Sequence, residues 1–375
     1  MKRLTLCVIF GGKSQEYYVS LRSAYTVLTN LSNEKYSIVK IGITRNGKWY
    51  IYSGENEQIP TDLWWKNEKY LTPVTIDLSS GQILMLDGTS RSITPHLVLP
   101  VMHGEAVEDG ALQGMLEMAG IKYVGCDHFS SAFGMDKQIT KLLASQIGIP
   151  VARGTIVDSY GVVASFYGSE YLEKVIRDSL SEKDIGACVN GEEINCEKEE
   201  IPPVIIKPCR AGSSVGLSLA KTKKELRRGV KMALEYSRSA LIEEYIEGFE
   251  VELAVLEYKG EILLSPIGRV IHKREVYDYE AKYQSSDNEY EIPAKADKGV
   301  EKSIKQYARA LFRQMGCKGI CRMDFFVTEG GAVLNEVNTL PGFTDISMYP
   351  MLFNHIGIST EQLIDIIVEN ELSKK

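Results

Sequence analysis

Cys321-Arg322-Met323-Asp324-Phe325-Phe326, followed by Leu334-Asn335-Glu336-Val337-Asn338-Thr339-Leu340-Pro341-Gly342, is the stretch of sequence that decides the fold. It contains two strand-like apolar runs, Met323–Val327 and Ala332–Val337. Glu336 and Asn338 are two positions apart, so their side chains point to the same face of an extended strand, where a paired strand would bring Asp324. Carboxylate and amide oxygens are the ligands that Mg²⁺ accepts beside substrate phosphates. The pattern therefore predicts a magnesium site.

Arg322 stands two positions before Asp324 and should share its face of the strand. A guanidinium group held beside a metal suits phosphoryl or acyl-phosphate chemistry, because its fixed donors match phosphate and carboxylate oxygens. Taken singly, each of these polar residues is more simply read as a solvated residue at a strand end. The complete set, in this order and followed by Pro341-Gly342, favours the functional interpretation.

The bulk composition is that of an average globular protein, with 375 residues, 44% hydrophobic and 25% charged. This length predicts two or three packed units. A net charge of −7 argues against a general nucleic-acid binder. The sequence holds no run of 18 apolar residues, which argues against a membrane partner, and the apolar run at Leu4–Phe10 is too short for a signal peptide. Seven scattered cysteines indicate reduced thiols, so we expect a cytoplasmic protein.

Strand and helix signals alternate along the first part of the chain, which predicts an α/β domain at 1–125 with a parallel sheet covered by helices. We place a central domain at 126–245 and a C-terminal domain with the metal strands at 246–375. Helices are expected over Phe129–Ile147 and Ser165–Leu180, among other segments. A polar surface insertion is expected at Ser181–Glu200, and a polar loop around Arg274–Glu291.

Lys207 ends an apolar strand and precedes a loop of small residues, Arg210-Ala211-Gly212-Ser213-Ser214-Val215-Gly216. Such a loop exposes backbone N–H groups that can hold phosphate oxygens, although the order of a Walker A loop is absent and a simple Gly/Ser turn remains the alternative.

Further on, the strand-like Leu241–Ile246 could pair its edge with an adenine. His103 ends another strand, where it either contacts a substrate or is a satisfied structural histidine. The aromatic and charged segment Tyr277–Tyr283 is either a lid or an ordinary loop.

Together these motifs resemble the D-alanine–D-alanine ligase family. The resemblance covers nearly the whole chain, except chiefly 181–200 and the loop around Trp64–Tyr70. Its markers follow the family's order and are Gly11-Gly12-Lys13-Ser14-Gln15-Glu16, His103-Gly104, Glu108-Asp109-Gly110, Met135-Asp136-Lys137, Lys207-Pro208, Tyr277-Asp278-Tyr279-Glu280-Ala281-Lys282-Tyr283 and Arg322 through Ser347. It implies the ATP-grasp fold, α/β overall and α+β in the ATP-binding part, with a Rossmann-like N-terminal domain.

The resemblance also implies a reaction. ATP phosphorylates the carboxylate of one D-amino acid, and the amine of a second attacks the resulting acyl phosphate. The residues implied to bind ATP are Lys137, Lys207, Glu243, Glu244, Ile246, Glu250 and Lys282. Two Mg²⁺ ions, or Mn²⁺, would be held by Asp324, Glu336 and Asn338. Arg322 and the backbone of Gly342 would stabilise the oxyanion, and Glu16, Ser213 and Tyr283 would form a hydrogen-bonded set. His103 would contact the first substrate, and Ser347 and Met348 the second.

Three positions depart from the family's usual pattern. Tyr17 and Tyr18 follow Glu16, where His or Arg and then Glu are common, and Val107 replaces a usual glycine. The resemblance therefore does not determine the shape of the first-substrate pocket. The tyrosine motif at 279–283 is kept, unlike in D-lactate ligases, and an uncharged Met348 favours D-alanine as the second substrate. Because Glu16-Tyr17 and Gly125-Cys126-Asp127 resemble serine-type sequences, a D-Ala–D-Ser ligase is the first alternative.

The second alternative is a non-catalytic ATP-grasp protein that only binds nucleotide. Such a protein could lose the metal and oxyanion residues without consequence, yet Arg322, Asp324, Glu336 and Asn338 are all present. The enzyme is therefore the favoured reading, with D-alanine and ATP as its substrates. A homodimer is implied by the family resemblance alone.

Overall fold

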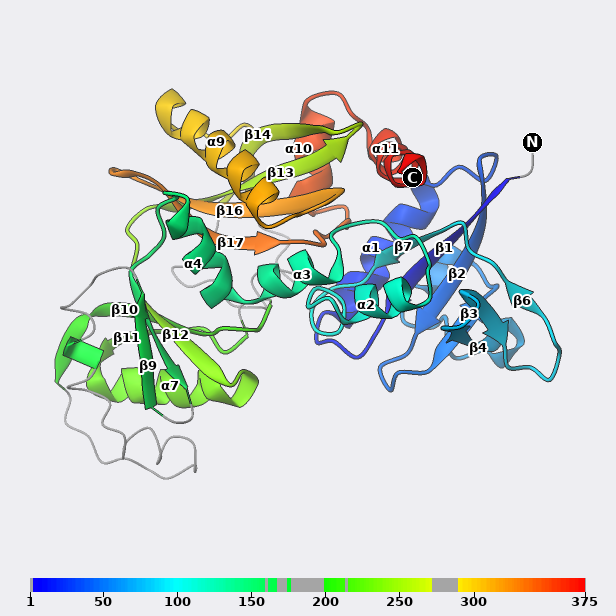
Figure 1. Ribbon diagram of the computed structural model, residues 1–375, viewed down its shortest axis with the longest axis horizontal. Helices are drawn as coiled ribbons and strands as arrows, with labels where there is room; N and C mark the ends of the chain where they lie inside the picture. Colours follow the sequence, from blue (N-terminus) through cyan, green and yellow to red (C-terminus); the bar gives the residue numbers. More distant parts are fainter. Residues whose placement is uncertain are drawn as a thin grey trace.

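Three β-sheets make up the framework of the protein (Figure 1). The computed structural model describes residues 3–158, 161–166, 174–176, 199–212, 215–271 and 289–374. We refer to the sheets as the N-terminal, central and C-terminal sheets, in chain order. Across these residues, the helices are all too short or too polar to cross a membrane.

The N-terminal sheet has seven strands in the order β6-β5-β4-β3-β2-β1-β7. Their bounds are β1 Leu4–Gly11, β2 Tyr36–Ile43, β3 Trp49–Tyr52, β4 Leu71–Asp77, β5 Gln82–Met85, β6 Ser92–Ile93 and β7 Leu97–Val101. Strand β1 pairs in parallel with β2 and β7, as the alternating pattern predicts. The strands from β3 to β6 extend the sheet in antiparallel fashion, because short connections join them without a crossover helix.

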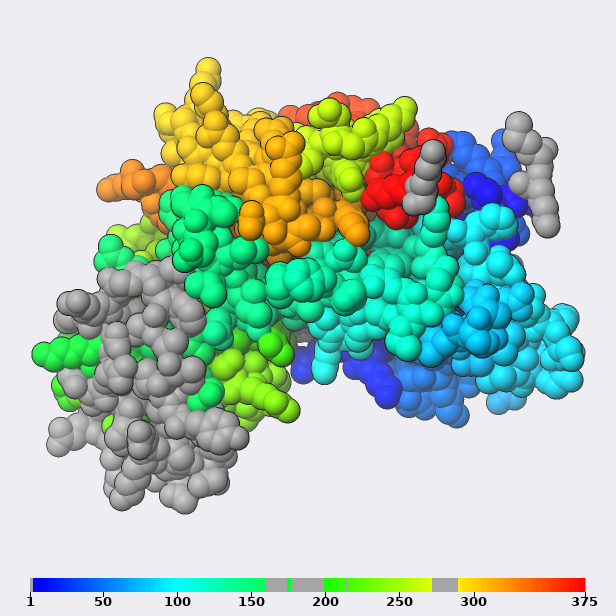
Figure 2. Space-filling view, viewed as in Figure 1, coloured from blue at the N-terminus to red at the C-terminus, as the bar shows by residue number. Residues whose placement is uncertain are grey.

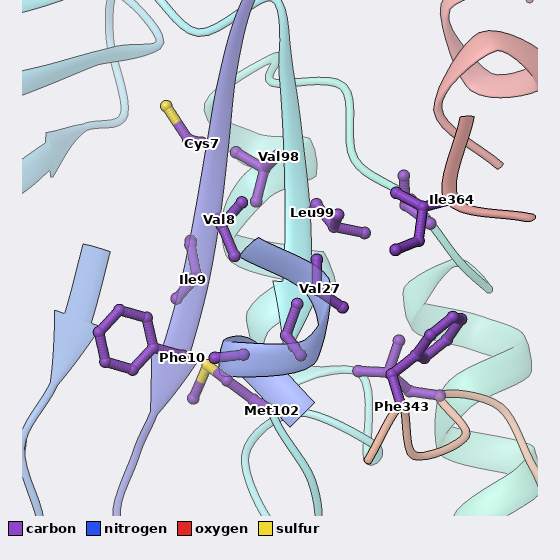
Figure 3. Packing of buried hydrophobic residues seen from close by; sticks show 14 of the residues in the cluster. Cys7, Val8, Ile9, Phe10, Val27, Val98, Leu99, Met102, Phe343 and Ile364 are labelled. Carbon is purple, nitrogen blue, oxygen red and sulfur yellow. The ribbon is translucent and has the colours of Figure 1, made fainter. Parts of the chain in front are cut away.

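The core of this sheet combines both ends of the chain. Strand β1 is a continuous apolar run, buried on both faces as expected for a central parallel strand. Helix α1 (Tyr17–Asn30) packs on it, and helix α2 (Ala111–Met118) adds Leu112 and Leu116 to the same cluster. Two late helices, α10 (Met348–His355) and α11 (Thr360–Ser373), contribute residues such as Phe353 and Ile364. Figure 3 shows Phe343 and Ile364 from this late segment near Val27 and Leu99.

The central sheet has five strands in the order β11-β10-β12-β8-β9. They are β8 Gly154–Asp158, β9 Gly161–Phe166, β10 Glu200–Pro208, β11 Ser218–Thr222 and β12 Ser239–Glu244, with helix α7 (Lys223–Tyr236) packed against β10. The expected helix at 165–180 is wrong at its start, because Ser165 and Phe166 belong to β9, which pairs with β8. Most of that helix, and most of the insertion expected at 181–200, lie outside the described residues.

Asp136 divides what the sequence suggested was one helix over 129–147. Helix α3 (His128–Met135) ends there, and helix α4 (Lys137–Gln146) begins one residue later. The backbone of Asp136 is extended, and its carboxylate accepts hydrogen bonds from the N–H groups of Gln138 and Ile139. Asp136 therefore caps α4 and makes Lys137 its first residue.

The C-terminal sheet has the order β15-β14-β13-β16-β17. Its strands are β13 Phe249–Tyr258, β14 Glu261–Ile271, β15 Glu289–Glu291, β16 Ile320–Thr328 and β17 Gly331–Asn338, with helix α9 (Lys298–Gln314) against one face. The loop expected over 274–291 ends earlier than predicted, because residues 289–291 pair with β14. Helices α3 and α4 pack on β17, which brings Lys137 toward the predicted metal ligands.

Candidate functional site

A pocket lies where residues of all three regions meet. The N-terminal region contributes Glu16 and His103, helix α4 contributes Lys137, and Gly212 comes from the loop after β10. The C-terminal region lines the rest of the pocket with the side chains or backbone of Arg322, Glu336, Asn338, Gly342, Ser347 and Met348. Nine of the predicted site residues therefore share one concave surface, although they are spread over more than 330 positions of sequence.

A wider cavity of about 880 Å³ adjoins this pocket and shares Glu16, Met135 and Gly212 with it. The central region lines it with Tyr236 and Arg238, near the end of α7. On the face shown in Figure 2, the surface is hollowed between the blue N-terminal atoms and the yellow-green atoms of the central region. The pocket thus opens into a space large enough for small-molecule substrates.

The pairing of β16 with β17 brings the predicted metal ligands together. Asp324 lies opposite Glu336, and Arg322 lies opposite Asn338. The side-chain nitrogen Nδ2 of Asn338 donates a hydrogen bond of 3.1 Å to Oδ2 of Asp324. This bond uses the amide nitrogen of Asn338 and not its oxygen. The three side chains therefore lie close together, as the spacing of two residues predicted.

The Arg322 guanidinium is held by two carboxylates. Its Nε and NH2 atoms donate to the two oxygens of Asp324 at 2.8 Å and 2.7 Å, and Glu252 Oε2 lies 2.9 Å from Nε. Burial alone would lower the pKa of Arg322, but Asp324 and Glu252 outweigh it and raise the pKa well above its usual value. Arg322 is thus a fixed positive charge at the pocket wall. Sequence reasoning missed Glu252, although its alternating position on β13 places it opposite Asp324.

The oxygens of Asp324, Glu336 and Asn338 fit a hard divalent cation. They comprise two carboxylates and one amide, and Glu336 Oε2 also lies 3.5 Å from the Lys137 ammonium nitrogen Nζ. Within the described ranges, the structure contains no group of three or more His, Cys, Asp or Glu arranged as a metal site. A cation here would therefore depend on the Asn338 oxygen and on substrate oxygens as well as on the two carboxylates.

Lys207 and Glu243 form a buried network with Lys141. Lys207 Nζ lies 2.7 Å from Glu243 Oε2, and Lys141 Nζ lies 2.5 Å from Glu243 Oε1. Burial alone would lower the pKa of Lys207 and raise that of Glu243, but the mutual attraction outweighs burial at both groups. Both therefore stay ionised. Lys141 is a residue that sequence reasoning missed.

The network continues toward Glu250. Lys207 Nζ is 3.3 Å from Asn335 Oδ1, and Asn335 Nδ2 donates to Glu250 Oε1 at 2.7 Å. Lys207, Glu243 and Glu250, three of the residues expected at the nucleotide, are therefore linked by contacts that join the central sheet to the C-terminal sheet. They do not line the pocket that contains Lys137. Glu244 instead accepts a hydrogen bond from the backbone N–H of Arg153. The half-buried Ile246 follows the end of β12.

Lys137 connects the loop after β10 with strand β17. Its Nζ donates a hydrogen bond of 2.7 Å to the carbonyl oxygen of Ala211, besides its ion pair with Glu336. Arg210, one residue earlier in the same loop, pairs with Asp136 at 2.7 Å. These contacts attach the small-residue loop to the beginning of α4. Ser213, in that loop, and Lys282 and Tyr283, in the expected lid, lie outside the described residues.

Glu16 and His103 both line the pocket at the end of the N-terminal sheet. Glu16 immediately precedes α1, and a Cβ atom placed on Gly104 would lie 2.7 Å from Glu16 Oε2. Gly104 has φ +79°, so glycine serves here both the turn and the close approach. His103 Nε2 lies 3.1 Å from Ser23 Oγ, and its Nδ1 lies 3.7 Å from Glu108. His103 is thus buried and partnered at the pocket edge.

Ser347 and Met348 begin α10 on the opposite wall. Ser347 Oγ accepts a hydrogen bond of 2.9 Å from the backbone N–H of Thr344, which fixes the turn that follows Gly342. Met348 is buried, and a Cβ atom on Gly268 of β14 would lie 2.7 Å from its sulfur. The wall beside Ser347 is therefore apolar.

The departures from the family pattern lie mainly behind the pocket. The Tyr17 hydroxyl donates to Asp62 at 2.8 Å and accepts from the indole N–H of Trp64 at 3.2 Å. Trp64 packs edge-on against Phe10 in the core. Val107 is also buried in that core, whereas half of the Tyr18 side chain is exposed. None of Tyr17, Tyr18 and Val107 lines the pocket.

Two family models match the chain. One is described as the D-ala D-ala ligase N-terminus and matches residues 5–126, and the other as the D-ala D-ala ligase C-terminus and matches residues 181–369. A D-alanine–D-alanine ligase of Caldicellulosiruptor bescii is 38% identical over 100% of this chain and 96% of its own length. A ligase of the same name from Acetivibrio thermocellus is 37% identical over 96% of this chain and 94% of its own.

Solved structures agree with these sequence comparisons. The VanG D-Ala:D-Ser ligase from Enterococcus faecalis superposes with a TM-score of 0.81 and 36% identity. The match covers 99% of this chain and all of that one. The three-sheet arrangement described above is therefore similar to that of a ligase from beginning to end.

Proposed function

Because the chain belongs to the D-alanine–D-alanine ligase family, we infer that it is an enzyme that joins two molecules of D-alanine for the synthesis of peptidoglycan precursor. ATP supplies the energy in this family. The observation that carries the inference is the shared pocket, in which Glu16, Lys137, Arg322 and Gly342 come from distant parts of the chain. Family membership gives the reaction, and the charged residues of the pocket support it.

The N-terminal wall of the pocket suits the first D-alanine. The carboxylate of Glu16 is held beside the Gly104 turn and would attract an ammonium group. His103 is fixed by Ser23 and would limit how that substrate lies. On the opposite wall, the Ser347 hydroxyl and the apolar Met348 would contact the second D-alanine.

The C-terminal wall suits the charge that develops during ligation. Arg322, fixed by Asp324 and Glu252, would stabilise the oxyanion of the tetrahedral intermediate together with the N–H of Gly342. Lys137 and Lys207 would hold the phosphate groups of ATP. Asp324, Glu336 and Asn338 would hold Mg²⁺, which neutralises negative charge on the phosphate groups when it is bound. The residues of these walls would thereby orient the substrates and exclude water around them.

Phosphate release is the measurement that tests the proposal. The full chain would be given Mg²⁺ and ATP with D-alanine alone, with D-alanine plus D-serine, and with D-alanine plus D-lactate, and the products would be separated. We expect phosphate release with D-alanine alone and the D-Ala–D-Ala dipeptide as the main product. An absence of phosphate release with every D-amino acid would overturn the proposal and favour a protein that only binds nucleotide.

A D-Ala–D-Ser ligase is the second candidate, and the similarity to VanG along the whole chain favours it. The buried, apolar Met348 at the second-substrate wall argues the other way, because it offers no hydrogen-bonding group to a serine hydroxyl. A mixed dipeptide as the dominant product in the competition above would select this second candidate.

We further propose that the protein acts in the cytoplasm as a homodimer, as the family resemblance implies. Burial raises the pKa of the Cys7 thiol to about 12 and that of Cys209 to about 11, so both are stable as reduced thiols. Sedimentation equilibrium of the full chain tests the dimer, and a monomer mass at micromolar concentration would contradict it.

A further inference from the structure

Lys141 lies inside the protein, yet it carries an ionisable group that the proposed reaction does not use. It is on helix α4, one turn after Lys137, and only 2% of its surface is exposed. It does not line the pocket or the adjoining cavity. A buried lysine is costly unless it is paired, so its presence calls for a physical reason.

Its partner is Glu243, and Glu243 is shared. The carboxylate of Glu243 lies between Lys141 on one oxygen, at 2.5 Å, and Lys207 on the other, at 2.7 Å. We call these three residues the buried triad. Two positive charges and one negative charge leave the triad with one net positive charge. Without the charge of Lys141 the triad would be neutral, and the nearby carboxylates of Glu250 and Glu336 would leave the surroundings of Lys207 negative.

We propose that Lys141 is a positioning residue for nucleotide binding, whose charge keeps the buried triad net positive so that Lys207 attracts the phosphate groups of ATP. The inference rests on the proposed function, because family resemblance assigns Lys207 to those phosphates. It goes beyond that function by giving a role to a residue to which the family resemblance assigns no contact with the nucleotide. The charge of Lys141 can act on the phosphate groups without direct contact, because the low dielectric of the protein interior screens it weakly.

The protonation of Lys141 adds a second, independent signature. Burial lowers the pKa of Lys141 to about 8, with Lys207 and Lys137 adding to the decrease and Glu243 opposing it. Below that pH Lys141 is charged and the triad is net positive. As the pH rises through about 8, Lys141 loses its proton and the triad becomes neutral. Nucleotide affinity should therefore fall across this range.

The experiment measures binding of ADP, AMP and adenosine by calorimetry, without turnover. Lys141→Met should weaken ADP binding at pH 7 by about tenfold or more, the effect of one charge at moderate screening. It should weaken AMP binding less and leave adenosine binding unchanged, because only the phosphate groups respond to charge. Lys302→Met, at an exposed position on α9, removes a lysine charge that is outside the triad and serves as the control.

The pH dependence of ADP affinity distinguishes an effect of the Lys141 charge from an effect of its side-chain packing. For the unaltered protein, ADP affinity should decline between pH 7 and pH 9, whereas Lys141→Met should show a flat profile in that range. Lys141→Arg keeps a charge that does not titrate, so it should bind ADP at pH 9 as tightly as at pH 7. If the arginine variant does not fold, the pH profiles of the unaltered protein and of the methionine variant still distinguish a charge effect from a packing effect.

Two outcomes would overturn the inference. The first is equal loss of ADP and adenosine binding in Lys141→Met, which would mean a structural role. The second is ADP binding by Lys141→Met that equals that of the unaltered protein at every pH. Failure of the unaltered protein to bind ADP at all is a different result, because it would overturn the proposed function and not only the role of Lys141.

Discussion

The backbone N–H of Phe343 donates a hydrogen bond of 3.2 Å to the hydroxyl of Ser23, which lies 320 positions earlier in the chain. The same hydroxyl lies 3.1 Å from Nε2 of His103. Ser23 therefore connects the histidine on the N-terminal wall of the pocket with the loop that begins at Gly342. Both walls of the pocket depend on one buried serine.

Ser23→Ala should leave the buried N–H of Phe343 without a partner. We expect the free energy of unfolding to fall by about 1–3 kcal/mol, together with a higher KM for D-alanine. Urea unfolding and steady-state kinetics would measure the two effects. Ser303→Ala removes a hydroxyl on helix α9 that donates to the carbonyl oxygen of Gly299, and should change neither. An unaltered KM in Ser23→Ala would separate Ser23 from the substrate pocket.

Arg322→Ala should nearly abolish ligation while leaving nucleotide binding largely intact. The reason is that Arg322 stabilises the oxyanion in the proposed reaction, and removing one such group costs about 10²–10³ in rate. Stopped-flow phosphate release gives the rate, and calorimetry with ADP gives the affinity. Arg313→Ala, at an exposed position, is the matched control. A parallel loss of ADP affinity would mean that Arg322 acts on the nucleotide.

Glu336→Gln should raise the Mg²⁺ concentration needed for half-maximal activity by about tenfold or more, because it replaces a charged ligand by a neutral one. Titration of Mn²⁺ with the ADP-bound protein, followed by electron paramagnetic resonance, gives the affinity without turnover. Glu329→Gln changes an exposed carboxylate at the turn between β16 and β17 and should have no effect. Equal metal affinity in both variants would remove Glu336 from the metal site.

Tyr17→Phe should destabilise the protein without changing its substrate kinetics. The variant loses the hydroxyl that joins Asp62 and Trp64, at a cost of about 1–2 kcal/mol in the free energy of unfolding. Tyr18→Phe, at the neighbouring half-exposed position, should cost little. Thermal unfolding and the KM for D-alanine are the measurements. A changed KM in Tyr17→Phe alone would place Tyr17 in the first-substrate pocket after all.

Met348→Gln should shift the product toward the mixed D-Ala–D-Ser dipeptide, because it gives the apolar wall a group that can bond a serine hydroxyl. A gain of about tenfold in the ratio of D-Ser to D-Ala incorporation is expected at most, as hydrophobic pockets discriminate weakly against a hydroxyl. Chromatography of products from a mixture of both amino acids gives the ratio. Met118→Gln lies on the surface and is the control. An unchanged ratio would mean that the second substrate does not contact Met348.

The arrangement of Asp324, Glu336 and Asn338 could be anticipated because it depends on local geometry. Side chains two apart on a strand share a face, and two strands separated by a short turn pair with each other. Arg322 followed from the same rule. These residues needed no knowledge of the rest of the fold.

Lys141 and Ser23 could not be anticipated in this way. A lysine in the middle of a helix usually reaches solvent, and only the packing of α4 between two sheets buries this one. Ser23 acts through Phe343, whose position depends on the C-terminal region meeting α1. By contrast, the division between α3 and α4 did leave a local signal, since Asp136 is a good capping residue.

The last helices of the chain cover the first strands, and this has a consequence for synthesis. A ribosome releases β1, α1 and β2 long before it makes α10 and α11, which complete the same core. Part of the apolar surface around Val27 and Leu99 therefore stays uncovered until the segment that contains Phe343 and Ile364 has been made. A prematurely terminated product ending before Phe343 would keep that surface exposed, and cellular quality control could distinguish it from the finished protein.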